Sequence, residues 1–101
     1  MAFDREKTLQ AAQKFVEKRK YDRAILEYQK VVQQEPNDAR TLLRIGDLQS
    51  RMGAHAEAIA TYDRVALYYA GRGFSLKAVA VLKQIGELIE RHAPQLGDQY
   101  G

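Results

Sequence analysis

The sequence predicts an all-α fold in which about five helices stack side by side as antiparallel neighbours. Two observations indicate this fold: apolar residues recur at helical spacing, and their pattern repeats after 34 residues. No segment has the pattern of a credible strand. The chain has 101 residues, which allows one compact domain. Its 46% hydrophobic and 29% charged residues are typical of a folded protein rather than a disordered chain.

Caps and helix breakers place the expected helices along the chain. They cover residues 4–19, 22–34, 39–52, 55–70 and 75–92. Pro36 cannot easily continue the second helix, and Asn37 or Asp38 can cap the third by accepting backbone N–H bonds. Gly53 ends the third helix, and Ser75 is the expected cap of the fifth.

The first two expected helices each present a packing face. The first gathers Ala12 and Phe15 on one side, where a small residue lets a neighbouring helix approach closely. The second spaces Ala24, Tyr28 and Val31 as i, i+4 and i+7, so that a small, an aromatic and a branched side chain form one stripe. These two helices are expected to pack on each other.

The third and fourth expected helices repeat the first two after 34 residues. The identities at this offset are Asp4/Asp38, Leu9/Leu43, Ala24/Ala58, Ile25/Ile59, Tyr28/Tyr62 and Val31/Val65. In the third helix Ile45, Gly46 and Gln49 stand on the face that the small residues occupy in the first. Each unit is therefore a pair of amphipathic helices.

These residues resemble a tetratricopeptide repeat (TPR) protein, whose 34-residue unit is a helix-turn-helix. Residues 21–38, with the closing Pro36, are close to the family pattern. The second unit departs from it at Gln49 and at Ala70, which replaces the closing proline, and the first has Thr8 where the family often places Trp. The resemblance implies a short right-handed α-solenoid. As a single domain over 1–101 it would hold repeats at 5–38 and 39–72, a terminal helix or partial repeat at 73–93 and a tail at 94–101.

The last third of the chain breaks the 34-residue period. Gly53 and Gly73 are 20 residues apart, Ala58 has a counterpart in Ala78, and Tyr62 matches Leu82 in character. One interpretation is that the fourth helix serves twice, as the second helix of its own repeat and as the first helix of the next.

The fifth expected helix has more apolar surface than one neighbouring helix can cover. Its candidate assembly residues are Leu76, Val79, Leu82, Ile85 and Ile89. An end helix of a solenoid needs a polar outer face for solubility. Either another chain covers this helix, or the stack continues in a longer TPR protein of which this chain is a fragment.

Residues with catalytic or metal-binding spacing were not found in the sequence. Cysteine is absent, and His55 and His92 are 37 residues apart without a second ligand at helical spacing. We therefore expect no enzyme activity, no metal and no cofactor. The basic run at 18–20 suits the dipole of a helix C-terminus, no aromatic residues interleave with it, and the net charge is only +3, so nucleic acid is not an expected partner.

A groove is the surface that the resemblance offers for binding. In TPR proteins the first helix of each repeat lines the concave face, and the matching candidate residues here are Leu9, Gln13, Arg40, Leu43, Arg44, Asp47 and Arg51. The arginines could hold an acidic segment, with Leu43 as the apolar anchor; the alternative is that these residues only solvate the groove.

Two hypotheses follow for function. The first is a non-catalytic scaffold that binds a protein or peptide segment through its groove or its apolar C-terminal end. The second is a self-assembly module that forms a homodimer or larger array through residues 75–92. The charged N-terminus lacks the apolar run of a signal peptide, so a cytoplasmic location without membrane association is expected.

Overall fold

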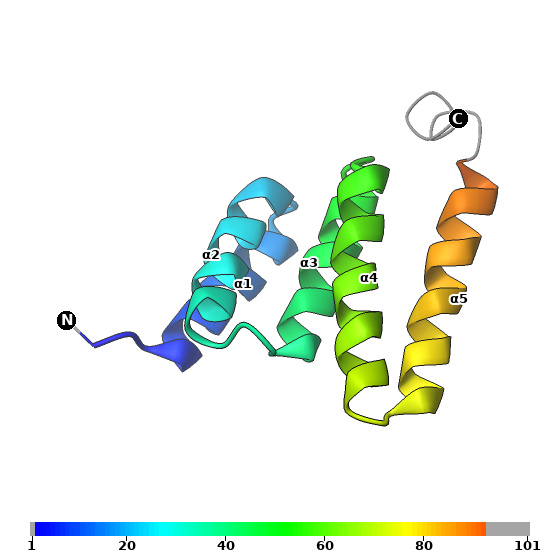
Figure 1. The fold of residues 1–101 in the computed structure, drawn as a ribbon. Helices are drawn as coiled ribbons and strands as arrows, with labels where there is room; N and C mark the ends of the chain where they lie inside the picture. Colours follow the sequence, from blue (N-terminus) through cyan, green and yellow to red (C-terminus); the bar gives the residue numbers. More distant parts are fainter. Residues whose placement is uncertain (1, 93–101) are drawn as a thin grey trace.

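The structure, a computed structural model, describes residues 2–92 as five consecutive α-helices. They are α1 (Arg5–Glu17), α2 (Tyr21–Gln34), α3 (Ala39–Arg51), α4 (His55–Gly71) and α5 (Ser75–Arg91). Each helix packs against its neighbour in the sequence, and the stack runs from α1 and α2 at one end to α5 at the other (Figure 1). The predicted all-α solenoid is confirmed; the expected tail at 94–101 lies outside the described residues.

Asp4 and Asp38, one of the pairs at the 34-residue offset, are the N-caps of α1 and α3. The Asp4 side chain accepts a hydrogen bond of 3.0 Å from the backbone N–H of Lys7, and Asp38 accepts one of 3.2 Å from that of Thr41. Both bonds satisfy backbone donors that the first turn of a helix leaves without partners. The repeat therefore preserves a start signal as well as a packing face.

Three helix corners share one hydrogen-bonded motif. After α3, the N–H of Ala54 donates to Gln49 O and that of Gly53 donates to Ser50 O, which is the Schellman pattern. The same pair of bonds closes α1 and α4, and Gly53 and Gly73 take the positive φ of 79° and 80° that the motif needs. At the first corner Arg19 holds this position with φ 59°. Helix α1 itself ends at Glu17, two residues earlier than expected.

The start of α5 differs from the sequence prediction. Its N-cap is Phe74, which makes no side-chain capping bond, and Ser75 is the first residue of the helix. The expected Ser75 cap is therefore wrong. The backbone N–H of Phe74 instead donates to Tyr69 O at 2.8 Å, so the corner is held by its backbone.

The hydrophobic core has two clusters. One lies between α1, α2 and α3 around Tyr28, and the other joins α3, α4 and α5 around Tyr62. Helix α4 is the middle helix of the second cluster, because the cluster also contains Leu42 of α3 and Val81 of α5. The α4–α5 corner also has the Schellman bonds of a corner within a repeat, whereas the α2–α3 connection does not. Both observations favour the interpretation that α4 serves twice.

The 20-residue correspondence holds only in part. Ala58 and Ala78 are both buried, as the pattern requires. Tyr62 is 3% exposed whereas Leu82 is 51% exposed, so these two residues do not occupy equivalent places. The buried residues of α5 are Ala78, Val81 and Leu88, and Leu82 lies on the exposed flank of the helix.

Gly46 of α3 packs closely against the Tyr62 ring of α4. A Cβ atom at this position would lie 2.7 Å from Cε1 of the Tyr62 ring, which is nearer than side chains tolerate. The Tyr62 ring is buried, and its hydroxyl donates a hydrogen bond to the Asp47 carboxylate, so the ring has little freedom to move aside. Ala12 and Tyr28 are likewise buried together in the first cluster.

We expect Gly46→Ala to destabilise the fold by about 1–3 kcal/mol, because relieving the clash requires a shift of the buried ring. The helix propensity of alanine, worth about 1 kcal/mol over glycine, offsets only part of this cost. Chemical denaturation monitored by circular dichroism measures the change. Gly71→Ala is the matched control: a Cβ there meets no atom within 4 Å, so its stability should be unchanged or higher. Equal stability of Gly46→Ala and the parent chain would contradict the close approach.

Candidate functional site

A groove of about 170 Å³ lies between α1, α2 and α3. Its lining residues are Gln13, Val16, Tyr28, Arg44, Asp47, Leu48 and Arg51. Four of the seven sequence-predicted groove residues are among them, from both first helices of the two repeats. The structure therefore brings part of the predicted set together, and Tyr28 of α2 contributes to the lining between them.

Two arginines in the groove lie over tyrosine rings. The Cζ atom of Arg44 is 5.9 Å from the centroid of the Tyr28 ring, and that of Arg51 is 5.9 Å from the centroid of the Tyr21 ring. Both distances are within the range of cation–π attraction, which orients a guanidinium without neutralising it. Within residues 2–92 neither arginine has a carboxylate within the 4.0 Å of an ion pair. Their charge is therefore available to a ligand.

Asp47 lies between these arginines in the sequence but is engaged by α4. Its carboxylate accepts the hydrogen bond from the Tyr62 hydroxyl. Burial of Tyr62 and this bond both raise the pKa of the phenol, so the proton stays on Tyr62 at any physiological pH. Asp47 is nevertheless exposed and lines the groove, so the groove surface holds two arginines and one carboxylate.

The other predicted groove residues lie elsewhere. Leu9 is half-buried against the first core cluster, and Leu43 is half-buried against the second. Arg40 is exposed on the first turn of α3 and does not line the groove. The apolar anchor foreseen at Leu43 is thus part of the packing, and Val16 and Leu48 supply the apolar lining instead.

The comparisons with known proteins concern the fold that carries this groove. The family model described as tetratricopeptide repeat matches residues 15–80, about two thirds of the chain. The chain belongs to the tetratricopeptide repeat family. No curated protein matches it.

Solved structures agree with the family. The chain is similar to the solution structure of a TPR domain protein from Salinibacter ruber, with 19% identity and a TM-score of 0.71 over 84% of this chain and 86% of that one. It is also similar to MamA of MSR-1, with 22% identity and a TM-score of 0.53, and to MamA of AMB-1, with the same two values. The chain spans about 60% of the length of the MamA chains. At these identities the similarity shows the TPR fold alone.

The predicted assembly residues of this TPR chain lie on the outer helix. Leu76 is 87% exposed, and Val79, Leu82 and Ile89 are each about half exposed. Ile85 differs, because it is half-buried against the core cluster between α4 and α5. The exposed apolar flank of α5 is therefore a surface of a different kind from the groove.

None of the five helices in residues 2–92 is long and apolar enough to cross a membrane.

The two histidines meet, although they are 37 residues apart in the sequence. His55 begins α4 and His92 follows the end of α5, so the antiparallel pair brings them together. Their rings stack with centroids 3.6 Å apart and an interplanar angle of 15°, and His55 Nδ1 is buried without a hydrogen-bond partner. The described residues hold no group of three His, Cys, Asp or Glu side chains that could bind a metal.

The stacked pair is expected to make the stability of the chain depend on pH. Burial lowers the pKa of His92, and the positive charges of His55 and Arg91 lower it further. The unfolded chain, with an ordinary histidine pKa of about 6.5, therefore takes up a proton more readily than the folded one. Stability from this group is present above that value and is lost as the pH falls.

We expect the free energy of unfolding to fall between about pH 7.5 and pH 5.5, the range around the unfolded pKa of histidine. In His92→Gln the fall should be smaller, since glutamine cannot take up the proton. Urea denaturation at the two pH values measures both. An identical pH dependence in the parent chain and in His92→Gln would contradict the lowered pKa.

Proposed function

We propose that the chain is a non-catalytic interaction module that binds an acidic protein segment through the groove between α1, α2 and α3. TPR domains are generally scaffolds that bind other proteins, and membership of the family supports this part of the proposal. The observation that carries the rest is the pair Arg44 and Arg51, oriented over tyrosine rings and without carboxylate partners among the described residues.

The chemistry of the groove fits carboxylates flanked by small apolar side chains. Arginine offers several N–H donors in a plane and can bind a carboxylate through two of them. Val16 and Leu48 give the groove an apolar floor, and Gln13 adds an amide that can donate or accept. A cytoplasmic location, consistent with the absence of cysteine, remains part of this proposal.

We expect Arg44→Glu and Arg51→Glu each to weaken binding of a labelled hexaglutamate peptide at least about tenfold, a loss of about 1.4 kcal/mol. The affinity of the parent chain should also fall as salt rises, because the arginines are exposed to solvent. Fluorescence anisotropy measures both effects.

Arg23→Glu is the matched control for charge. It reverses an exposed arginine on α2 that does not line the groove, and it should leave the affinity within about twofold. If Arg23→Glu weakens binding as strongly as Arg44→Glu, the peptide binds through overall charge and the groove proposal is wrong. Arg40→Glu measures whether the site extends to the first turn of α3.

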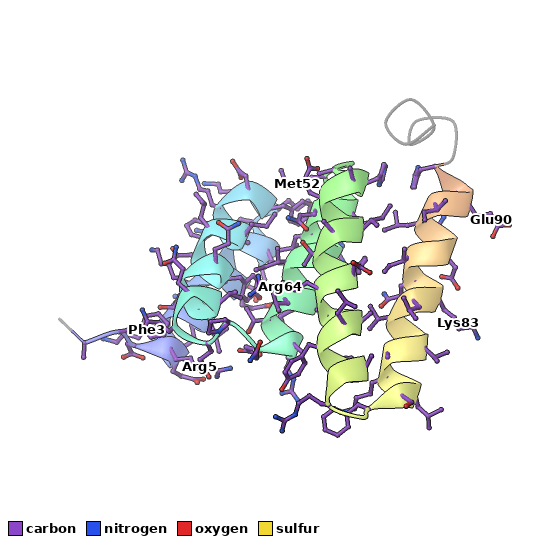
Figure 2. The ribbon with its side chains drawn as sticks, in the orientation of Figure 1. Phe3, Arg5, Met52, Arg64, Lys83 and Glu90 are labelled. Carbon is purple, nitrogen blue, oxygen red and sulfur yellow. The ribbon has the colours of Figure 1, made fainter. Side chains whose placement is uncertain are left out.

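A second candidate function, self-assembly through α5, has its own supporting observation. Val79, Leu82, Gly86 and Ile89 follow one another at intervals of three, four and three residues, the spacing of a helix–helix seam. Val79, Leu82 and Ile89 are exposed, and a Cβ at Gly86 would meet no atom within 4 Å. A second copy of α5 could therefore approach closely along this flank. Figure 2 shows Lys83 and Glu90 on the outer side of the same helix.

We expect the chain to dimerise at tens of micromolar and Leu82→Glu to return it to a monomer, since the new charge would be buried in the seam. Light scattering or sedimentation measures the mass. Gln84→Glu adds the same charge two residues away, outside the seam, and should leave the dimer intact. A parent chain of 11.5 kDa at these concentrations, or a dimer that survives Leu82→Glu, would rule out this interface.

A further inference from the structure

A second cleft, lined by residues that the groove does not use, lies where the α2–α3 connection faces the α4–α5 corner. Both connections lie along the same edge of the stack, at the bottom of the view in Figure 1. The cleft has a volume of about 550 Å³, within the range of small-ligand and peptide sites. Tyr68, Tyr69 and Phe74 line one side of it, and residues 35–39 with Arg5 line the other.

The aromatic side of the cleft consists of three neighbouring rings. The ring centroids of Tyr68 and Tyr69 are 6.0 Å apart, and those of Tyr69 and Phe74 are 6.2 Å apart with an edge-on angle of 79°. Lys77 Nζ lies 5.2 Å from the centroid of Phe74 and 5.6 Å from that of Tyr69, which restrains both rings. Phe74 is 45% exposed, so apolar ring surface is open to a ligand.

The opposite side of the cleft is held in place from two directions. Arg5 Nε donates to Glu35 at 2.7 Å and Arg5 Nη2 to Asp38 at 2.9 Å, which ties the start of α1 to the connection. From α4, Arg64 Nη2 donates to Pro36 O at 2.9 Å. A cleft whose walls are fixed before binding costs less ordering entropy when a ligand enters.

The charge of the cleft favours a neutral ligand. Arg5 is paired with both Glu35 and Asp38, and Lys77 over the aromatic rings balances the second negative charge, so these four side chains carry no net charge. Burial alone would raise the pKa of Asp38, but hydrogen bonds from Thr41 and Arg5 outweigh it and lower the pKa, so this carboxylate stays ionised and bound to Arg5.

We propose that this cleft binds a neutral, proline-rich segment of a partner protein in the polyproline II conformation. A polyproline II helix rises about 3.1 Å per residue, so two residues span about 6 Å, the spacing of the rings. Proline side chains pack on aromatic rings, and this backbone leaves its carbonyl oxygens unbonded. The hydroxyls of Tyr68 and Tyr69 and the amide of Asn37 supply donors for them. The proposal is independent of the groove, with which the cleft shares no lining residue.

The test uses the full chain labelled with ¹⁵N and two blocked nine-residue peptides, one of proline alone and one of alternating glycine and serine. The proline peptide should shift the backbone amide signals of residues 35–39 and 68–74, apart from the proline, and the glycine–serine peptide should bind at least about tenfold more weakly. Absence of shifts at millimolar peptide, shifts confined to the groove, or equal binding of both peptides would each overturn the proposal.

Variants separate the cleft from the groove. Phe74→Ala should weaken binding of the proline peptide at least about tenfold, whereas Arg44→Glu should leave it within about twofold. Phe74→Leu keeps an apolar side chain at the corner without the ring, so it should fold normally and still lose affinity. If Phe74→Leu binds as tightly as the parent chain, or if Arg44→Glu abolishes binding, the aromatic wall is not the site.

Discussion

The close packing of the Tyr62 ring on Gly46, a residue without a side chain, is the interaction on which the structure depends. Gly46 brings α3 close enough to α4 for the Tyr62 ring to fill the space between them. The same ring reaches Asp47 with its hydroxyl and so fixes a groove residue from the core side. Ala12 and Tyr28 form the earlier counterpart, and Tyr28 also underlies Arg44. Packing within each repeat thus positions residues of the groove.

The sequence was sufficient to predict the helices and the buried faces of α2 and α4, because those features are local. Asp38 and Gly53 are start and stop signals that act within a few residues, and Ala24, Tyr28 and Val31 show their common face by spacing alone. Tertiary contacts decided the rest. Leu43 is the kind of apolar residue that can anchor a peptide, but it packs against the core. Nothing near His55 in the sequence indicates that His92 will stack on it. The antiparallel α4–α5 pair, once predicted, could have suggested that meeting.

The charged surface divides into paired and unpaired regions, although the net charge is only +3. At the N-terminal end Arg5 is held between Glu35 and Asp38 and serves the structure. In the groove Arg44 and Arg51 rest on aromatic rings instead. Arginine therefore forms ion pairs with a loop in one place and lies on aromatic rings in another, a distinction that the amino-acid composition does not reveal.

The central place of α4 has a consequence for how the chain unfolds. In a repeat protein each unit contacts only its neighbours, so stability propagates along the stack and ends can open independently. Here one cluster joins α3, α4 and α5, with Ala58, Tyr62 and Val65 of α4 between Leu42 and Val81. The last three helices are therefore expected to unfold as one cooperative unit, whereas α1 and α2 join it through the α2–α3 packing and the ion pairs of Arg5. Local opening is accordingly expected to start at the α1 end and to reach α4 last.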